Sequence, residues 1–202
     1  GHERNDLVEL SAFNGSALTD GVDVYPVQKT ADGAVAYVKR IPSKGYVVLR
    51  SAEAAPEKET FRIEERPAGG FCLETPFYEI AINDQGEFTS LFDKENDRQV
   101  LQDGKAGNEL RIYEDKPLCY SNWNTDIFHQ EKSWRVENVR SMEWLENGPV
   151  RATLLVEREL MGTVVRQKIH FYGEDRRIDF ETYVDWKFSE HLLKVHFPVD
   201  VH

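Results

Sequence analysis

The sequence predicts an all-β protein, and three observations lead to this fold class. Short runs of alternating apolar and polar residues recur along the chain, clusters of turn-forming residues separate them, and helical periodicity is almost absent. Hydrophobic residues make up 40% of the 202 residues and aromatic residues 11%, which is enough to fill a core. We therefore expect a small β-sandwich-like domain followed by part of a large antiparallel β-sandwich.

The clearest predicted strands form a meander in the second half of the chain. Residues 150–159 and 165–172 alternate between apolar and polar side chains, and so do residues 178–187. The segments between them, 146–149 and 173–176, are short and rich in turn formers. One face of the last strand consists of Ile178, Phe180, Thr182, Val184 and Trp186. Regularly spaced strands of this kind are typical of a sandwich or a barrel.

Changes in composition divide the chain into three parts. Residues 3–51 form the predicted small β domain, residues 52–59 a charged linker that contains Pro56, and residues 60–202 the N-terminal part of the large sandwich. About 45 residues make a small core. The small domain is therefore expected either to complete a sandwich with sequence upstream of this chain or to lean on the second domain. The abrupt end at His202 suggests a fragment of a longer protein.

Charge and cysteine content restrict the partners and the compartment. The formal net charge is -11, which argues against a nucleic-acid backbone and against anionic membranes as partners. No run of about 20 apolar residues is present to span a bilayer. Cys72 and Cys119 lie far apart without metal-site spacing, so we expect reduced, partly buried thiols in a cytoplasmic protein.

The segment 107–131 interrupts the β pattern with a dense group of polar and aromatic residues. Asn, Asp and Pro are depleted in strands, so this segment is predicted to be a long structured connection. Such connections often carry function when the scaffold around them is rigid.

Several short motifs resemble the C-terminal β region of glycoside hydrolase family 38, the retaining α-mannosidases. They occur in the family's order over nearly the whole chain: RIPSKGY (40–46), LETPFY (73–78), GEFTSLFDKE (86–95), GNEL (107–110), EDKP (114–117), and Trp186, Glu190, Leu193, Lys194, Phe197 and Pro198. Trp123 and Asp126 match two positions of the family's Y-D-A-W-D-I-D signature. The large domain would then be part of a supersandwich of the galactose mutarotase type.

The resemblance implies a non-catalytic fragment of a zinc-dependent enzyme of bacterial cytoplasmic type. In this family a carboxylate nucleophile forms a glycosyl-enzyme, a second carboxyl group acts as acid and base, and zinc held by His and Asp residues contacts the sugar. The resemblance places these groups in an α/β domain and a helical bundle outside this chain. We therefore expect no catalytic residue and no metal site here. The expected partners are those missing domains and, through them, the mannoside substrate.

The departures from the signature leave three candidates for carbohydrate binding at the active-site rim: Tyr120, Trp123 and Asp126. Neutral Ser121 and Asn124 stand where the family commonly has acids, so sugar contacts are not carried over to them. Trp123 has a structural alternative as well, because a single Trp in a long loop often plugs the end of a sandwich.

The alternatives to this interpretation are a metal site within this chain, a stand-alone binding module and an aldose epimerase. The histidines are scattered without paired ligand spacing, so surface or hydrogen-bonded roles are favoured over a metal site: His129, His170, His191 and His196. A stand-alone carbohydrate-binding or interaction module would bind mannosides without further domains. An aldose epimerase would need a general acid and base inside one complete sandwich, of which this chain holds about half.

Overall fold

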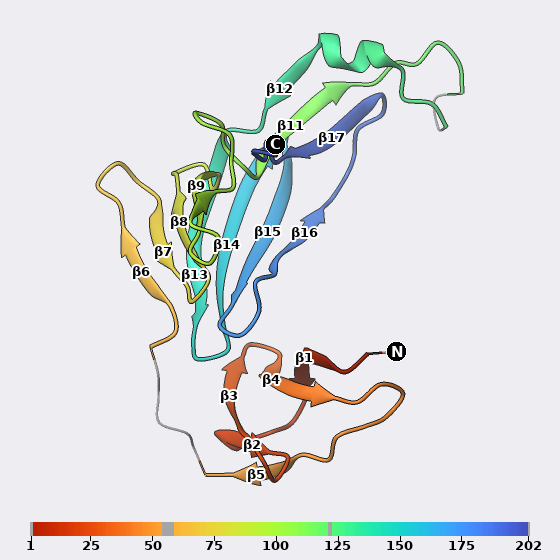
Figure 1. Cartoon of the computed structure of the whole chain (residues 1–202). Coiled ribbons are helices and arrows are strands. Elements are labelled where there is room, and N and C mark those ends of the chain that lie inside the picture. Colours follow the sequence, from red (N-terminus) through yellow and green to blue (C-terminus); the bar gives the residue numbers. More distant parts are fainter. Residues whose placement is uncertain (1, 54–58, 121–122, 202) are drawn as a thin grey trace.

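The computed structural model describes residues 2–53, 59–120 and 123–201, and these form antiparallel β-sheets joined by turns and loops (Figure 1). The all-β prediction is confirmed: within the described ranges the sole helix is the short 3₁₀ helix η1 (Ile127–Glu131). In those same ranges no helix has the length and apolar character needed to cross a membrane. Residues 54–58 of the predicted linker lie outside the described residues.

The first domain is a five-stranded antiparallel sheet in the order β1-β4-β3-β2-β5. Its strands are β1 (Arg4–Leu10), β2 (Ala17–Thr19), β3 (Val24–Thr30), β4 (Gly33–Ile41) and β5 (Arg50–Ala52). β4 lies between β1 and β3, and its residues 34–38 are all buried, so both of its faces are covered. The last strand ends at Ala52, one residue beyond the predicted domain boundary.

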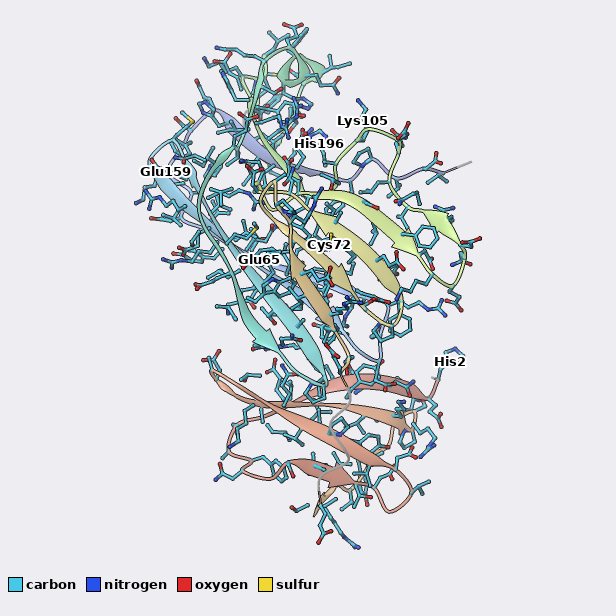
Figure 2. The ribbon with its side chains drawn as sticks, turned by 90° about the vertical axis from the view of Figure 1, so that its left-hand side faces the viewer. His2, Glu65, Cys72, Lys105, Glu159 and His196 are labelled. Carbon is cyan, nitrogen blue, oxygen red and sulfur yellow. The ribbon has the colours of Figure 1, made fainter. Side chains whose placement is uncertain are left out.

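The small sheet rests on the end of the large domain (Figure 2). This is the second of the two arrangements expected from the sequence, in which the small domain leans on the large one. The buried side chain of Gln28 makes the central contact. Its Oε1 accepts the N–H groups of Val150 at 3.0 Å and Arg151 at 2.9 Å, and its Nε2 donates to the Arg151 carbonyl at 2.9 Å. Tyr37 donates to Asp175 at 3.3 Å. The Gln28 side chain thereby makes the hydrogen bonds to the backbone of Val150 and Arg151 that a neighbouring strand would otherwise make.

The large domain is a sandwich of two antiparallel sheets, in the orders β10-β9-β8-β7-β6 and β13-β14-β15-β16. The first contains β6 (Arg62–Glu65), β7 (Phe71–Glu74), β8 (Tyr78–Ile82), β9 (Phe88–Asp93) and β10 (Arg98–Gln99). The second contains β13 (Asn138–Asn147), β14 (Arg151–Leu160), β15 (Thr163–Tyr172) and β16 (Ile178–Val184). Their facing side chains form one core: Phe61, Leu73, Ile80, Ile82, Phe88, Leu101, Ala152, Leu154, Val156, Ile169 and Phe171.

A third sheet in the order β12-β11-β17 continues the sandwich at the end far from the small domain (Figure 1). Its strands are β11 (Glu109–Glu114), β12 (Ser133–Arg135) and β17 (His191–His196). Its apolar face packs on the ends of β14 and β15 through Leu110, Ile112, Leu193, Leu160 and Val165. The opposite face carries polar side chains and supports the long connection between β11 and β12.

Two strands differ from the prediction. The strand predicted over 178–187 ends at Val184, and Trp186 lies beyond it with its ring 5.4 Å from that of Phe188. β13 was not predicted, although its residues alternate between exposed and partly buried positions. Its register shifts twice, between Val139 and Ser141 and between Trp144 and Glu146, so bulges hide the two-residue period from sequence reading.

A buried arginine stands inside the sandwich. The inward positions of β14 continue to Arg158, which is 1% exposed. Its guanidinium donates to the carbonyl groups of Gln85 at 2.8 Å and Gly86 at 3.2 Å and to Oε1 of Gln167 at 3.3 Å, and Asn108 donates to the same Oε1. Burial lowers the pKa of Arg158 to about 10. These bonds join the β8–β9 turn to the middle of the opposite sheet.

Candidate functional site

The connection between β11 and β12, residues 115–132, is the longest excursion from the sheets and is called the β11–β12 loop below. It projects past the end of the third sheet and returns through η1 (Figure 1). Ser121 and Asn122, and with them one of the two neutral signature positions, lie outside the described residues. The sequence predicted a connection over residues 107–131, but Glu109–Glu114 form strand β11, so the prediction is wrong for that part. Residues 115–132 form the connection, and its described part is held by backbone hydrogen bonds such as that from the Asp115 N–H to the Glu190 carbonyl.

Asp126 organises the described part of this loop. Its Oδ2 accepts the N–H of Leu118 at 2.9 Å, which ties the two arms of the loop together. Its backbone carbonyl accepts the N–H of His129 at 3.1 Å, the first contact of η1. One oxygen of the predicted sugar-binding carboxylate is therefore already used for loop structure, which the sequence did not indicate.

Tyr120 and Trp123 stand in solvent at the outer end of the loop. The Trp123 side chain is 90% exposed and that of Tyr120 is 74% exposed. The Tyr120 carbonyl accepts the N–H groups of Trp123 at 2.7 Å and Asn124 at 2.9 Å, with Tyr120 in the left-handed region at φ 56°. The alternative in which Trp123 plugs the end of the sandwich is wrong, because its ring contacts no core.

The loop exposes further apolar side chains beside these two. Leu118 is 84% exposed, Ile127 71% and Phe128 50%. So many exposed large apolar side chains on one loop are unusual for a surface that contacts only water. Exposed apolar patches often mark sites of contact with other molecules or domains. The structure thus places the three predicted residues, Tyr120, Trp123 and Asp126, on one projecting loop, which also exposes Leu118, Ile127 and Phe128, and the sequence analysis did not predict that exposure.

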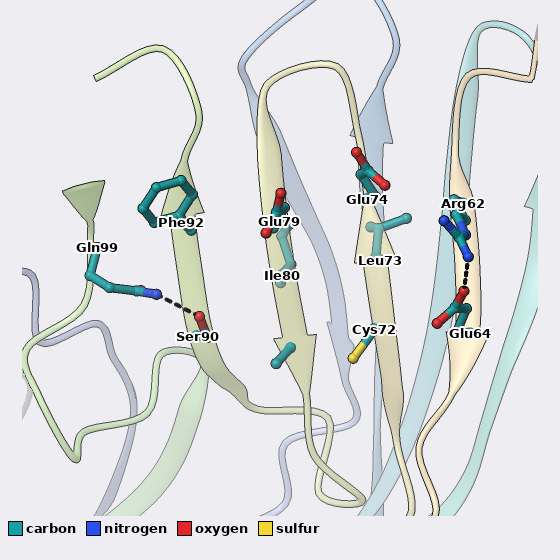
Figure 3. A pocket seen from close by; sticks show the side chains of 11 residues that line it. Arg62, Glu64, Cys72, Leu73, Glu74, Glu79, Ile80, Ser90, Phe92 and Gln99 are labelled. Atoms are coloured by element: carbon teal, nitrogen blue, oxygen red, sulfur yellow. Dashed lines mark hydrogen bonds and ion pairs between the residues drawn. The ribbon is translucent and has the colours of Figure 1, made fainter. Parts of the chain in front are cut away.

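Two larger hollows lie away from the loop. One, of about 480 Å³, runs over the outer face of the β6–β10 sheet, where Cys72, Glu74 and Glu79 are exposed and Gln99 donates to Ser90 at 2.8 Å (Figure 3). Its polar side chains face outward without converging on one point. The other, of about 740 Å³, lies between β1 of the small domain and β14–β16.

His170 lies in that interdomain hollow and is buried, in agreement with the predicted hydrogen-bonded strand histidine. Its Nδ1 is 2.9 Å from Oγ1 of Thr153, and its Nε2 is 3.4 Å from Oε2 of Glu181. Burial lowers the pKa of His170, and the positive charge of Arg151 acts in the same direction. The structure therefore favours the neutral imidazole.

Acid should destabilise the chain through this histidine. Because the pKa of His170 is lower in the folded state, the unfolded chain takes up the proton first as the pH falls below about 6.5. The free energy of unfolding then falls by at most about 1.4 kcal/mol per pH unit from this one group. In urea denaturation between about pH 7 and pH 5, His170→Gln should show a shallower fall than wild type. Exposed His2→Gln should not, and equal slopes for His170→Gln and wild type would contradict the assignment.

The exposure of the two cysteines differs from the prediction. Cys72 and Cys119 are free but exposed, so the expectation of partly buried thiols is wrong. Within residues 2–53, 59–120 and 123–201, no group of three or more His, Cys, Asp or Glu side chains is placed to hold a metal ion.

Comparison with known proteins agrees with the motifs. Residues 73–202 match the model of the glycosyl hydrolases family 38 C-terminal domain. Alpha-mannosidase G of Dictyostelium discoideum is 28% identical over 207 residues, which cover 95% of this chain and 19% of that protein. Alpha-mannosidase 2C1 of Homo sapiens and that of Mus musculus are each 22% identical over 167 residues, or 80% of this chain and 16% of each protein.

The family match covers more than half of the chain and includes strands β8 to β17 and the β11–β12 loop. The chain spans less than a fifth of the length of these curated relatives. Each of those relatives is named an α-mannosidase. The chain therefore belongs to glycosyl hydrolase family 38, whose C-terminal domain it carries.

Proposed function

We propose that this chain is the non-catalytic β region of a retaining, zinc-dependent α-mannosidase that hydrolyses α-mannosides. The family match over residues 73–202 supports the proposal, as do the names of the relatives. In a retaining glycosidase one carboxylate forms the covalent intermediate and a second carboxyl group acts as acid and then base. We assign both to catalytic and helical domains of the same cytoplasmic polypeptide, and the mutarotase-type supersandwich to the complete β region.

Within that enzyme, the β11–β12 loop is proposed to form part of the active-site rim. The observation that carries this is the exposure of Trp123 and its apolar neighbours on an internally bonded projection. A free projection of this kind suits contact with another domain and with a substrate between the two. The indole of Trp123 would lie against the apolar face of a sugar ring.

Tyr120 and Asp126 supply the polar part of this proposed contact. The phenol of Tyr120 can donate to and accept from a sugar hydroxyl. Asp126 already accepts one N–H through Oδ2, but a carboxylate offers about four lone-pair sites, so it keeps acceptor capacity for hydroxyl groups. These three residues bind and orient substrate in this proposal, and none of them is a nucleophile or an acid.

Zinc belongs to the parent enzyme in this proposal, where it would hold sugar hydroxyls. The described residues of this chain do not fit the metal, because no three of their His, Cys, Asp or Glu side chains converge as zinc ligands must. No step of the reaction is therefore routed through zinc on this chain.

Hydrolysis of an α-mannoside by the intact protein tests the proposal. We expect the full-length protein to hydrolyse a chromogenic α-mannoside but not the β-anomer, a chelator to abolish the activity, and added zinc to restore it. The 202-residue chain alone should be inactive. Failure of the full-length protein to hydrolyse α-mannosides would overturn the proposal.

A stand-alone carbohydrate-binding module is the second candidate, because a solvent-exposed tryptophan also suits sugar binding without a catalytic partner. The isolated chain separates the two. The rim proposal expects no mannoside-induced shift in the indole N–H resonance of Trp123 at millimolar sugar. A saturable shift would favour the binding module.

A further inference from the structure

One histidine attaches the β11–β12 loop to the sheet beneath it. His129 is the buried residue of η1, 8% exposed, whereas its neighbours Ile127 and Phe128 face solvent. Its Nε2 is 2.6 Å from Nζ of Lys194 on β17, and its ring packs edge-on against Tyr113 of β11 at 5.4 Å. Two strands and the loop therefore meet at this imidazole.

The partners of the two ring nitrogens fix the protonation state of His129. Nδ1 lies 2.8 Å from the carbonyl oxygen of Asp126, which can only accept, so Nδ1 carries a hydrogen. Nε2 faces the ammonium group of Lys194, which can only donate, so Nε2 carries none. The imidazole is neutral in this arrangement, with its proton on Nδ1.

Lys194 is held for this contact by the strand it belongs to. Its Nζ lies 5.2 Å from the centre of the Tyr113 ring, and in the ladder it stands directly across from Arg111. Within the described ranges it has no carboxylate ion-pair partner. The imidazole lone pair and the face of the tyrosine ring are what stabilise this cation.

We propose that neutral His129 and Lys194 form a clasp that positions the β11–β12 loop. The contacts run from Lys194 to His129, through the carbonyl of Asp126 to its carboxylate, and on to the N–H of Leu118. Only the predicted effect of the clasp on enzyme activity rests on the proposed function; the clasp itself does not.

The titratable groups around the imidazole come from three segments. β17 contributes Lys194 and also His196, whose Nε2 is 2.8 Å from the hydroxyl of Tyr113. β11 contributes Tyr113 itself, and the loop contributes Asp126, whose carboxylate is turned to Leu118. Figure 2 places His196 near the end of the molecule from which the loop projects.

Hydrogen exchange in the 202-residue chain tests the clasp. His129→Phe keeps the ring contact but removes the acceptor, and Lys194→Met keeps the stem but removes the donor. Each should raise amide exchange in residues 118–129 about tenfold, because a hydrogen bond to a charged group is lost. Exchange in β14 and β15 should stay unchanged, and so should all exchange in Lys187→Met, which removes an exposed lysine paired with Asp185.

Unchanged exchange in residues 118–129 of both variants would overturn the clasp. Equal increases throughout the chain would also overturn it, because the contact would then hold the whole fold and have no special effect on the loop.

Kinetics of the full-length enzyme separate the clasp from the proposed function. Lys194→Met should lower kcat/KM for α-mannosides about tenfold, whereas the control Lys187→Met should keep the wild-type kcat/KM. If the full-length protein hydrolyses no α-mannoside, the rim role fails while the exchange result still decides the clasp. If it does, and Lys194→Met exchanges faster but hydrolyses normally, the clasp does not position a substrate-contacting loop.

Discussion

Trp123→Ala should lower kcat/KM of the full-length enzyme for α-mannosides about tenfold, equivalent to about 1.4 kcal/mol of lost transition-state binding. The indole is 90% exposed and supports no core, so the free energy of unfolding should change by less than about 0.5 kcal/mol. Steady-state kinetics and urea denaturation of the same preparations measure the two quantities. Trp123→Phe should recover part of the loss, because a smaller ring keeps part of the contact.

Tyr46→Ala is the matched control for this experiment. Tyr46 is an aromatic residue of the small domain that is 83% exposed, and it lies outside the β11–β12 loop. Its removal should leave both kcat/KM and stability unchanged. A large stability loss with normal kinetics in Trp123→Ala would contradict the rim, and so would an equal kinetic loss in Tyr46→Ala.

Gln28→Ala should produce the largest loss of stability, about 3 kcal/mol. The substitution leaves the N–H groups of Val150 and Arg151 without an acceptor and the Arg151 carbonyl without its side-chain donor, at a site where Gln28 is only 6% exposed. It also leaves a space beside Gly148, because the Gln28 side chain packs directly against the backbone of that glycine. Urea denaturation of the 202-residue chain gives the difference.

Gln99→Ala serves as the control for Gln28→Ala. Gln99 is an exposed glutamine of β10 whose side chain donates to Ser90 and accepts the N–H of Leu91. Both contacts are exposed to water, which can replace them, so the loss should cost less than about 0.5 kcal/mol. If Gln28→Ala costs no more than this control, the small domain is not joined to the large one through that side chain.

Regular alternation accounts for the elements that sequence reasoning found. The strands predicted over 150–159 and 165–172 correspond to β14 and β15. These two strands pair without a register shift, so the two-residue period holds along their whole length. β13 escaped because two bulges break its period. Trp186 was assigned to a strand that stops at Val184, and alternation does not say where pairing ends.

Buried polar side chains were harder to predict. Arg158 occupies the inward position that follows Val156. Because charged residues are seldom buried, the sequence analysis did not predict that the inward face of the strand continues to Arg158. Gln167 shares its strand face with the apolar Val165, Ile169 and Phe171, and this was the available signal for a polar core, because a buried amide needs partners. The partners, Asn108 and Arg158, come from other strands, which a single sequence does not bring together.

The candidate site follows the same division. Tyr120, Trp123 and Asp126 are close in sequence, so their common loop was predictable. The bond from the Leu118 N–H to Asp126 required knowledge of the loop's path, and the His129–Lys194 contact joins residues 65 positions apart. The exposure of Trp123 depends on where the loop projects, which is a property of the third sheet.

A structure of the full-length protein with a mannose-derived inhibitor bound tests the central claim most directly. The account predicts the β11–β12 loop at the opening of the active site, with the indole of Trp123 within about 4.5 Å of the sugar. A loop that faces bulk solvent on a side of the enzyme away from the bound sugar would contradict it.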